Sequence, residues 1–178
     1  MNPTAPPTGV VGIEDHLQRL WTPHRMVYID SHQTPADKVR CPFCEGPTMD
    51  DAAALIVHRG QAAFVILNLY PYNPGHLLVC TYRHVADYTD LSQDEVAEVA
   101  DLTRQAMRVI RGVSAPAGFN LGINQGSVAG AGVADHFHQH VVPRWLGDAN
   151  FFPVVAQTKA IPQLLDDTRR LLAESWSR

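Results

Sequence analysis

The sequence predicts an α+β domain in which an antiparallel sheet of about five strands packs against a central helix and a C-terminal helix. Short apolar runs separated by Gly, Pro and Asn turns are typical of consecutive antiparallel strands. Residues 92–112, and again residues 161–176, repeat apolar side chains at helical spacing. The chain of 178 residues is long enough for one such domain with its own core. We expect this single domain over residues 12–178, after a flexible tail over residues 1–11 that is rich in Pro and Thr.

Composition excludes several classes of protein. Hydrophobic residues make up 46% of the chain and charged residues 18%, which indicates a folded, globular protein. The net charge of −4 lacks the basic excess expected of a protein that binds nucleic acid or an acidic membrane surface. The apolar runs are too short to span a bilayer. Three cysteines, with no secretory signal, favour a reducing, cytoplasmic setting.

The first half of the chain predicts a short helix and then a meander of three strands. Residues 12–21 place Ile13, Leu17, Leu20 and Trp21 on one helical face, and Thr22-Pro23 ends the helix. Residues 28–40 are polar and are predicted to be extended. Residues 55–57 and 64–67 flank a Gly-containing turn and predict a hairpin. After a second turn over residues 70–75, residues 76–81 predict the third strand.

The second half predicts the long helix, two more strands and a final helix. Ser92 and Glu95 form a capping box at the start of the long helix, and Gly112 is expected to end it. Residues 119–123 and 136–142 predict strands on either side of a glycine-rich loop over residues 126–132. In the final helix four leucines are expected to point inward: Leu164, Leu165, Leu171 and Leu172.

Three histidines alternate along the last predicted strand. Because successive side chains of a strand point to opposite faces, His136, His138 and His140 share one face, while Phe137 and Val141 point to the core. An imidazole titrates near neutral pH, so it can attack phosphorus, stabilise an oxyanion or bind a metal ion. The row therefore indicates either a phosphate-attacking active site or a histidine metal site.

The run from His136 to Val142 resembles the motif of the histidine-triad family, in which three histidines alternate with apolar residues. Residues 67–76 resemble the ribose-binding strand and the following turn of that family. Asn124-Gln125-Gly126 and Ala129-Gly130 resemble its phosphate loop. The glycine-rich loop is not a P-loop, because no Gly-Lys-Ser/Thr follows it. Two features depart from the pattern: Gln139 is polar where the family prefers an apolar residue, and one extra residue precedes His136.

The resemblance implies a histidine-triad fold and a role for each matching residue. His138 would attack the α-phosphorus of a nucleotide, and His140 would stabilise phosphate oxygens or assist the leaving group. Asn68 would bind the ribose, and Asn124 with the loop amides would hold phosphate. Trp145 would stack on adenine or line a subunit contact, although core packing is an equal alternative. The implied catalytic residues are His138, His140 and Asn124. The implied nucleotide-binding residues are Asn68, Asn124, Gly130, Ala131, Gly132, His140 and Trp145.

The loop before the triad bears on the reaction. Hydrolases of this family that act on dinucleoside polyphosphates usually carry Gln and then Thr or Ser after the Ala-Gly of the loop, where this chain has Ala131 and Gly132. The pattern is similar to that of actinobacterial diadenosine tetraphosphate phosphorylases of the family. It implies a nucleotidyltransferase that uses inorganic phosphate and releases ATP and ADP. The alternatives are a hydrolase of dinucleoside polyphosphates or nucleoside phosphoramidates, and a nucleotide-binding signalling protein without turnover.

The pair Cys41 and Cys44 has the spacing with which two thiolates reach one tetrahedral zinc ion. A redox dithiol and two buried thiols are the alternatives. In zinc-bearing members of the superfamily, a His after the third strand and the first His of the triad complete the site, which implies His84 and His136 as the other ligands. Zinc would then have a structural role. No organic cofactor is expected.

The resemblance also implies a homodimer or homotetramer, with sheets joined across a two-fold axis. Four other histidines are expected at the surface: His16, His24, His32 and His58. Cys80 is expected to be a small apolar filler in the core. For His76, bracing of the site and plain packing are equal alternatives.

Overall fold

The computed structural model describes residues 41–148 and 161–176 of the chain. Several expectations fall outside these residues: the tail over residues 1–11, the domain boundary at residue 12, the helix over 12–21, the extended segment over 28–40, and the positions of His16, His24 and His32.

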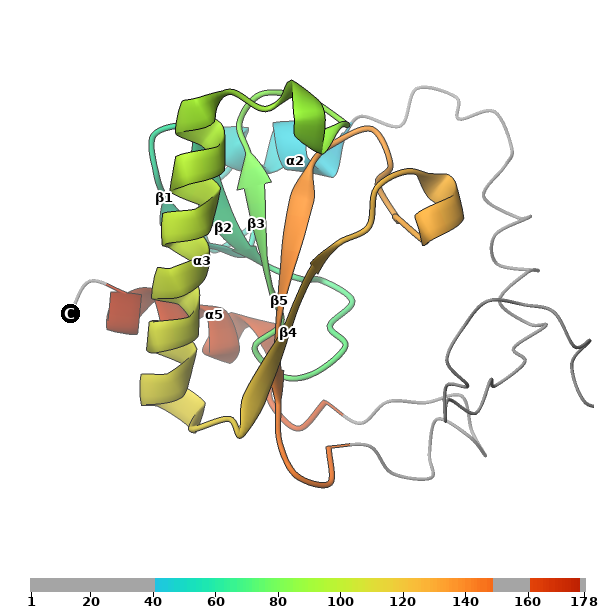
Figure 1. Cartoon of the computed structure of the whole chain (residues 1–178). Coiled ribbons are helices and arrows are strands. Elements are labelled where there is room, and N and C mark those ends of the chain that lie inside the picture. Colours follow the sequence, from blue (N-terminus) through green and yellow to red (C-terminus); the bar gives the residue numbers. More distant parts are fainter. Residues whose placement is uncertain (1–40, 149–160, 177–178) are drawn as a thin grey trace, which may run out of the picture. The chain divides into compact units, whose positions relative to one another are not determined.

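Within the described residues, five strands form one antiparallel sheet in the order β1-β2-β3-β5-β4 (Figure 1). The strands are β1 (Ile56–Arg59), β2 (Ala63–Leu67), β3 (Leu77–Thr81), β4 (Gly118–Ile123) and β5 (His138–Arg144). The first three form the predicted meander, and β5 lies between β3 and β4. The predicted sheet and fold class are confirmed.

The strand that carries the triad begins two residues later than predicted. The N–H group of Phe137 donates to the carbonyl of Val85, which lies beyond the end of β3. The backbone therefore joins the sheet ladder only at His138, which pairs with Cys80. His136 thus stands just before the strand and is free to face a different set of groups.

The strand register gives the sheet two distinct faces. Residues directly opposite each other in an antiparallel pair share a face, so His138 lies beside Cys80, and His140 lies beside Leu78. Phe137 and Val141 point the other way and are 2% and 0% exposed, as predicted.

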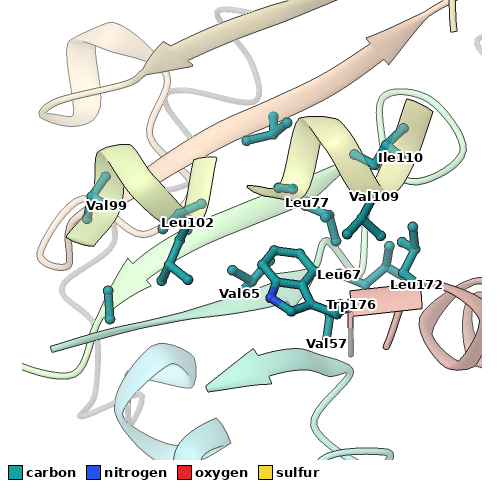
Figure 2. Packing of buried hydrophobic residues seen from close by; sticks show 14 of the residues in the cluster. Val57, Val65, Leu67, Leu77, Val99, Leu102, Val109, Ile110, Leu172 and Trp176 are labelled. Carbon is teal, nitrogen blue, oxygen red and sulfur yellow. The ribbon is translucent and has the colours of Figure 1, made fainter. Parts of the chain in front are cut away.

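The face opposite the histidines is covered by α3 (Gln93–Ser114) and α5 (Leu165–Trp176). Figure 2 shows how side chains from both helices meet side chains of the strands in one apolar cluster. The labelled members are Val57, Val65, Leu67, Leu77, Val99, Leu102, Val109, Ile110, Leu172 and Trp176. This cluster supports β5 from behind, so the histidine face rests on a packed core.

Helix α3 begins at the predicted capping box. The hydroxyl of Ser92 accepts from the N–H of Glu95, and the carboxylate of Glu95 accepts from the N–H of Ser92. The expected end at Gly112 is wrong, because the helix continues to Ser114 and Ala115 adopts φ 44°. Pro116 explains the later end, since the residue before a proline is disfavoured in the helical region.

Helix α5 begins at Leu165, four residues later than expected, and presents a different face to the core. Leu172 is buried, but Leu164 is 74% exposed and Leu171 is 39% exposed, so their predicted inward positions are wrong. The buried side chains are four residues apart, at Thr168, Leu172 and Trp176, so they lie on one face of the helix.

His58 was expected at the surface, but its side chain is half-buried. Its ring stacks on Trp176 with the ring centroids 4.9 Å apart and the planes 15° from parallel.

The other face of the sheet is partly covered by the segment that holds the cysteine pair. It comprises α2 (Pro42–Glu45) and the 3-10 helix η1 (Gly46–Thr48). Phe43 anchors this segment in a second apolar cluster with Ile56, Phe64, Leu78 and Cys80. Cys80 is fully buried there, which confirms its role as a small apolar filler. No helix among the described residues is both long enough and apolar enough to cross a membrane.

Candidate active site and metal centre

The ring of His138 is held in one tautomer by the backbone. Its Nδ1 atom lies 2.9 Å from the carbonyl oxygen of His136. A carbonyl only accepts hydrogen bonds, so Nδ1 carries the proton and donates it. The Nε2 atom is then left with its lone pair, which is the form an imidazole needs for nucleophilic attack. The side chain is 5% exposed, so most of the ring is fixed by packing.

His140 is held in the opposite tautomer by His76. The N–H of Tyr72 donates to Nδ1 of His76 over 3.0 Å, so the proton of His76 is on Nε2. That Nε2 lies 2.9 Å from Nδ1 of His140 and donates to it. His140 therefore carries its own proton on Nε2. Among the described residues this buried Nε2 has no hydrogen-bond partner, which marks it as a donor that awaits a ligand oxygen.

Burial keeps these imidazoles neutral. Burial, together with smaller contributions from the neighbouring His140 and His138, lowers the pKa of His76 to about 3. It lowers the pKa of His140 to about 4, with a contribution from His138. Burial also lowers the pKa of His138, although the hydrogen bond to the carbonyl of His136 opposes the shift. At neutral pH the site thus offers one lone pair, on His138, and one N–H donor, on His140.

Tyr72 is a site residue that the sequence did not single out, and His76 is one whose role the sequence left open. The sequence left His76 open between bracing and packing, and the structure gives it a contact with His140. The ring of Tyr72 stacks over that of His140, with centroids 5.8 Å apart and planes 13° from parallel. The signal for His76 in the sequence is its position directly before β3, the strand that pairs with the triad strand. The position of Tyr72 depends on how the turn before β3 folds back over His140.

A recess of about 380 Å³ opens beside His140. Asn124, which directly follows β4, lines it together with Tyr72 and Asn120. The pairing of Gly122 with His140 brings the end of β4 to this position. Arg144 also lines the recess, but its guanidinium is engaged by Asp148 over 2.6 Å and 2.9 Å. A larger hollow of about 750 Å³ lies between α3 and α5 and contains none of the triad histidines.

The glycine-rich loop follows Asn124. Gly126 and Gly130 adopt φ 78° and 83°, conformations that favour glycine. Between them the chain forms one 3-10 turn, η3 (Ser127–Ala129). Ala131 and Gly132, the two positions that bear on the reaction, carry no polar side chain, so only backbone groups can contact an anion there.

Asn68 and Trp145, two further predicted contacts, lie in different surroundings. The amide nitrogen of Asn68 is 3.3 Å from Nδ1 of His76, which places Asn68 beside the triad. The indole N–H of Trp145 donates over 3.1 Å to the carbonyl of Ser114, near the end of α3. Trp145 is seven residues beyond His138, which at about 3.3 Å per strand residue is roughly 23 Å away along β5.

The four expected metal ligands converge at the other end of the triad. The ligand atoms of Cys41, Cys44, His84 and His136 all lie within 4.8 Å of one another. Nδ1 of His136 lies 3.2 Å from Sγ of Cys41 and 3.2 Å from Nδ1 of His84. Sγ of Cys44 lies 3.3 Å from Nδ1 of His84.

These separations pass a simple test for a tetrahedral metal ion. Zn–S bonds of about 2.3 Å and Zn–N bonds of about 2.05 Å require ligand separations of about 3.3 Å for N to N and about 3.6 Å for N to S. The observed separations of 3.2–3.5 Å are close to these values. Nε2 of His136 donates to the carbonyl of Thr81 over 2.8 Å, which leaves the lone pair on Nδ1, toward the thiols. The cluster is able to hold a metal ion.

Comparison with known proteins agrees with this geometry. A family model for the HIT domain matches residues 50–145. The chain belongs to the histidine-triad family. An AP-4-A phosphorylase from Mycobacterium tuberculosis is 51% identical over 94% of this chain and 89% of its own length.

Two solved structures of the histidine-triad family are similar in fold. One is a zinc-bound histidine triad family protein from Mycobacterium smegmatis, with a TM-score of 0.63 and 27% identity over 79% of this chain and 95% of that chain. The other is a hypothetical histidine triad nucleotide-binding protein from Sulfolobus tokodaii, with a TM-score of 0.62 and 25% identity over 77% of this chain and 92% of that chain.

The departure of this chain from the usual histidine-triad motif has a local cause. Gln139 points away from the histidines, toward α3, where its amide donates over 2.8 Å to the hydroxyl of Thr103. That hydroxyl in turn donates to the carbonyl of Val99. A polar residue is tolerated at this motif position because α3 offers it a partner, and the histidine face is unaffected.

Proposed function

We propose that this protein is a nucleotidyltransferase that cleaves diadenosine tetraphosphate with inorganic phosphate to give ATP and ADP. The observation that carries the proposal is the pair of opposite tautomers: a free Nε2 lone pair on His138 beside an Nε2–H donor on His140. Similarity over nearly the full chain to an AP-4-A phosphorylase supports the same reaction. The physical basis is covalent catalysis, in which one difficult displacement is divided into two easier ones.

In the first step, Nε2 of His138 attacks the α-phosphorus, and the bond to the bridging oxygen breaks. ATP leaves with that oxygen, and the N–H of His140 stabilises the negative charge that develops there. In the second step, an oxygen of inorganic phosphate attacks the same phosphorus and the P–N bond breaks. ADP leaves, and His138 regains its lone pair. Asn68 would bind the ribose, and Asn124 with the amides of Gly130, Ala131 and Gly132 would hold the phosphate chain.

The choice of phosphate over water is attributed to the loop before the triad. Ala131 and Gly132 replace the larger polar side chains that hydrolases of the family usually carry. Without them these two positions leave room for a phosphate anion and offer no polar side chain to orient a water molecule. Hydrolysis on the same scaffold is the alternative, and it differs only in the acceptor.

The metal site is proposed to hold zinc in a structural role. Two thiolates and two imidazoles at tetrahedral separations are the donor set that zinc prefers. A bound zinc ion would cross-link the segment at Cys41 and Cys44 to the ends of two central strands. We further propose a cytoplasmic location, since free thiols persist in a reducing compartment, and a homodimer formed through the exposed edge of the sheet at β4.

The test is product analysis with purified protein, with and without phosphate. We expect ATP and ADP in equal amounts, with a rate that depends on phosphate. Equal cleavage without phosphate, with release of AMP, would establish the hydrolase instead. His138→Ala should abolish turnover and retain nucleotide binding, whereas His58→Ala, a histidine outside the site, should retain both. Nucleotide binding without turnover in the parent protein would favour a signalling role.

A further inference from the structure

His136 faces the metal centre with its ring and the nucleophile with its main chain. Its Nδ1 atom lies 3.2 Å from Sγ of Cys41 and 3.5 Å from Sγ of Cys44. Its carbonyl oxygen accepts the hydrogen bond that orients His138. The residue stands before the start of β5, so the regular sheet ladder does not hold this carbonyl. An interaction that fixes the ring of His136 therefore also helps to fix its carbonyl oxygen, which accepts the hydrogen bond from Nδ1 of His138.

The ring of Phe43 provides a second connection. Phe43 lies between the two cysteines in the sequence and is 7% exposed. Its ring centroid is 5.1 Å from that of His138 and 5.5 Å from that of His136. The segment that supplies two metal ligands thus also packs directly on the attacking imidazole.

We propose that the metal centre positions the nucleophile: metal binding by Cys41, Cys44, His84 and His136 fixes the ring of His138 through the carbonyl of His136 and the ring of Phe43. The inference rests on the proposed function, because it concerns the same nucleophile. It goes beyond a structural role, since it predicts that metal loss slows attack at phosphorus more than it weakens nucleotide binding. Phe43 is a positioning residue in this scheme, because its ring packs on the imidazole of His138.

The physical reason is that the segment has few other constraints. Helix α2 has four residues, and its backbone hydrogen bonds stay within the segment: the N–H groups of Cys44 and Glu45 donate to the carbonyl of Cys41. Phe43 packs it on the sheet, and beyond α2 the guanidinium of Arg59 on β1 donates to the carbonyls of Pro47 and Met49. Cys41 and Cys44 themselves have no such tie to a strand among the hydrogen bonds of the described residues. A metal ion bound by the four ligands would join this short segment to His84 and His136. Misplacement of a nucleophile by about 1 Å is enough to cost a large part of the rate.

The main experiment compares the zinc-loaded protein with the same protein after chelation and after zinc is returned. Metal content is measured in each sample. Two quantities follow: the single-turnover rate of nucleotidyl transfer to His138, and the dissociation constant of an unreactive diadenosine tetraphosphate analogue. We expect chelation to slow the transfer by about tenfold or more, the affinity to change by less than threefold, and added zinc to restore the rate.

A spectroscopic readout separates positioning from general loosening. In ¹⁵N-histidine-labelled protein, the Nδ1–H proton of His138 should give a sharp, slowly exchanging signal when zinc is bound. We expect this signal to broaden or exchange faster after chelation, while the signal from the His76 Nε2–H remains. An unchanged His138 signal after chelation contradicts the proposal.

A matched pair of substitutions tests the aromatic connection without removing the metal. Phe43→Leu and Phe64→Leu both remove a buried ring of the same apolar cluster, but the ring of Phe64 packs against that of Tyr82 and not against a histidine. We expect only Phe43→Leu to slow the transfer, at unchanged zinc content. Equal rates in the two variants, or equal rates with and without zinc, overturn the inference. If the zinc-loaded parent forms no nucleotidyl-histidine, the proposed function itself fails.

Discussion

Nε2 of His76 lies 2.9 Å from Nδ1 of His140, and this hydrogen bond decides which nitrogen of His140 carries the proton. The chain of hydrogen bonds begins at the backbone N–H of Tyr72, which can only donate, so Nδ1 of His76 is an acceptor. The proton of His76 is then on Nε2, and its donation to Nδ1 of His140 places the proton of His140 on Nε2 as well. The result is an N–H on the outer nitrogen of His140, beside a nucleophile whose outer nitrogen is bare.

Removal of the His76 ring should impair chemistry and spare binding. His76→Leu leaves Nδ1 of His140 without a donor, so both tautomers of His140 become accessible. We expect kcat to fall by about 100-fold, with little change in the affinity for an unreactive substrate analogue. His76→Gln places an amide donor near the lost Nε2–H and should recover part of the rate. Equal kcat values for the Leu and Gln variants would contradict the tautomer argument.

His76 and His140 should stay neutral well below the ordinary pKa of histidine. Because burial lowers the pKa of these rings to about 3 and about 4, both stay largely unprotonated in the folded protein as the pH falls from 6.5 to about 5. Their ¹⁵N chemical shifts should therefore remain those of neutral imidazole down to about pH 5. A midpoint near pH 6.5 for either ring, measured by NMR titration, would show that the ring is accessible to water.

The same shifts make stability depend on pH, with a definite sign. The unfolded chain binds protons at histidine below about pH 6.5, whereas the folded chain does not, so the free energy of unfolding falls as the pH is lowered from 6.5 toward 4. Urea denaturation at several pH values measures this slope. His76→Leu lacks one such group, and its slope should be smaller by up to about 1.4 kcal/mol per pH unit. Identical slopes would contradict the prediction.

Gly60 should not tolerate a side chain. A Cβ at this position would overlap the carboxylate of Glu98 and lie 2.8 Å from the carbonyl oxygen of Ala63. Glu98 accepts hydrogen bonds from the backbone of the β1–β2 turn, so moving it would also break those bonds. We expect Gly60→Ala to lower the free energy of unfolding by about 2 kcal/mol.

Gly112 provides the matched control for this substitution. A Cβ there meets no heavy atom of the described residues within 4 Å, and the residue lies within α3. Gly112→Ala should therefore raise the free energy of unfolding by up to about 1 kcal/mol. Urea denaturation of both variants measures the difference, and a stable Gly60→Ala protein would show that the turn can rearrange.

Polar side chains in the loop before the triad should move the reaction toward hydrolysis. In the double variant Ala131→Gln and Gly132→Thr, we expect the share of AMP among the products to rise and the dependence on phosphate to weaken. Val128→Gln adds a polar side chain at a position of the same loop that is 94% exposed, and it should leave the products unchanged. Product ratios measured by chromatography decide between these outcomes.

Local patterns determined much of this protein from the sequence. The capping box at Ser92, the meander and the alternation of His138 with Phe137 each depend on residues close together in the chain, where backbone geometry allows few arrangements. The metal ligands His84 and His136 were reached through resemblance, and the structure then placed their nitrogens beside the thiols. The predicted helix end at Gly112 was wrong because the helix continues until Pro116 stops it. The predicted burial of Leu164 and Leu171 was wrong because the helix buries the face that carries Trp176 instead.

The tertiary structure alone decided which proton sits on which imidazole. The sequence determined that three histidines share one strand, because side chains alternate along a strand. It could not determine the tautomers, since those depend on partners that are distant in the chain: His76 is 64 residues from His140, and Thr81 is 55 residues from His136. Only the register of β3 against β5 brings these groups within hydrogen-bonding distance. That register leaves a lone pair on Nε2 of His138 and an N–H on Nε2 of His140, and it turns Nδ1 of His136 toward the two thiols, as the proposed roles of the three residues require.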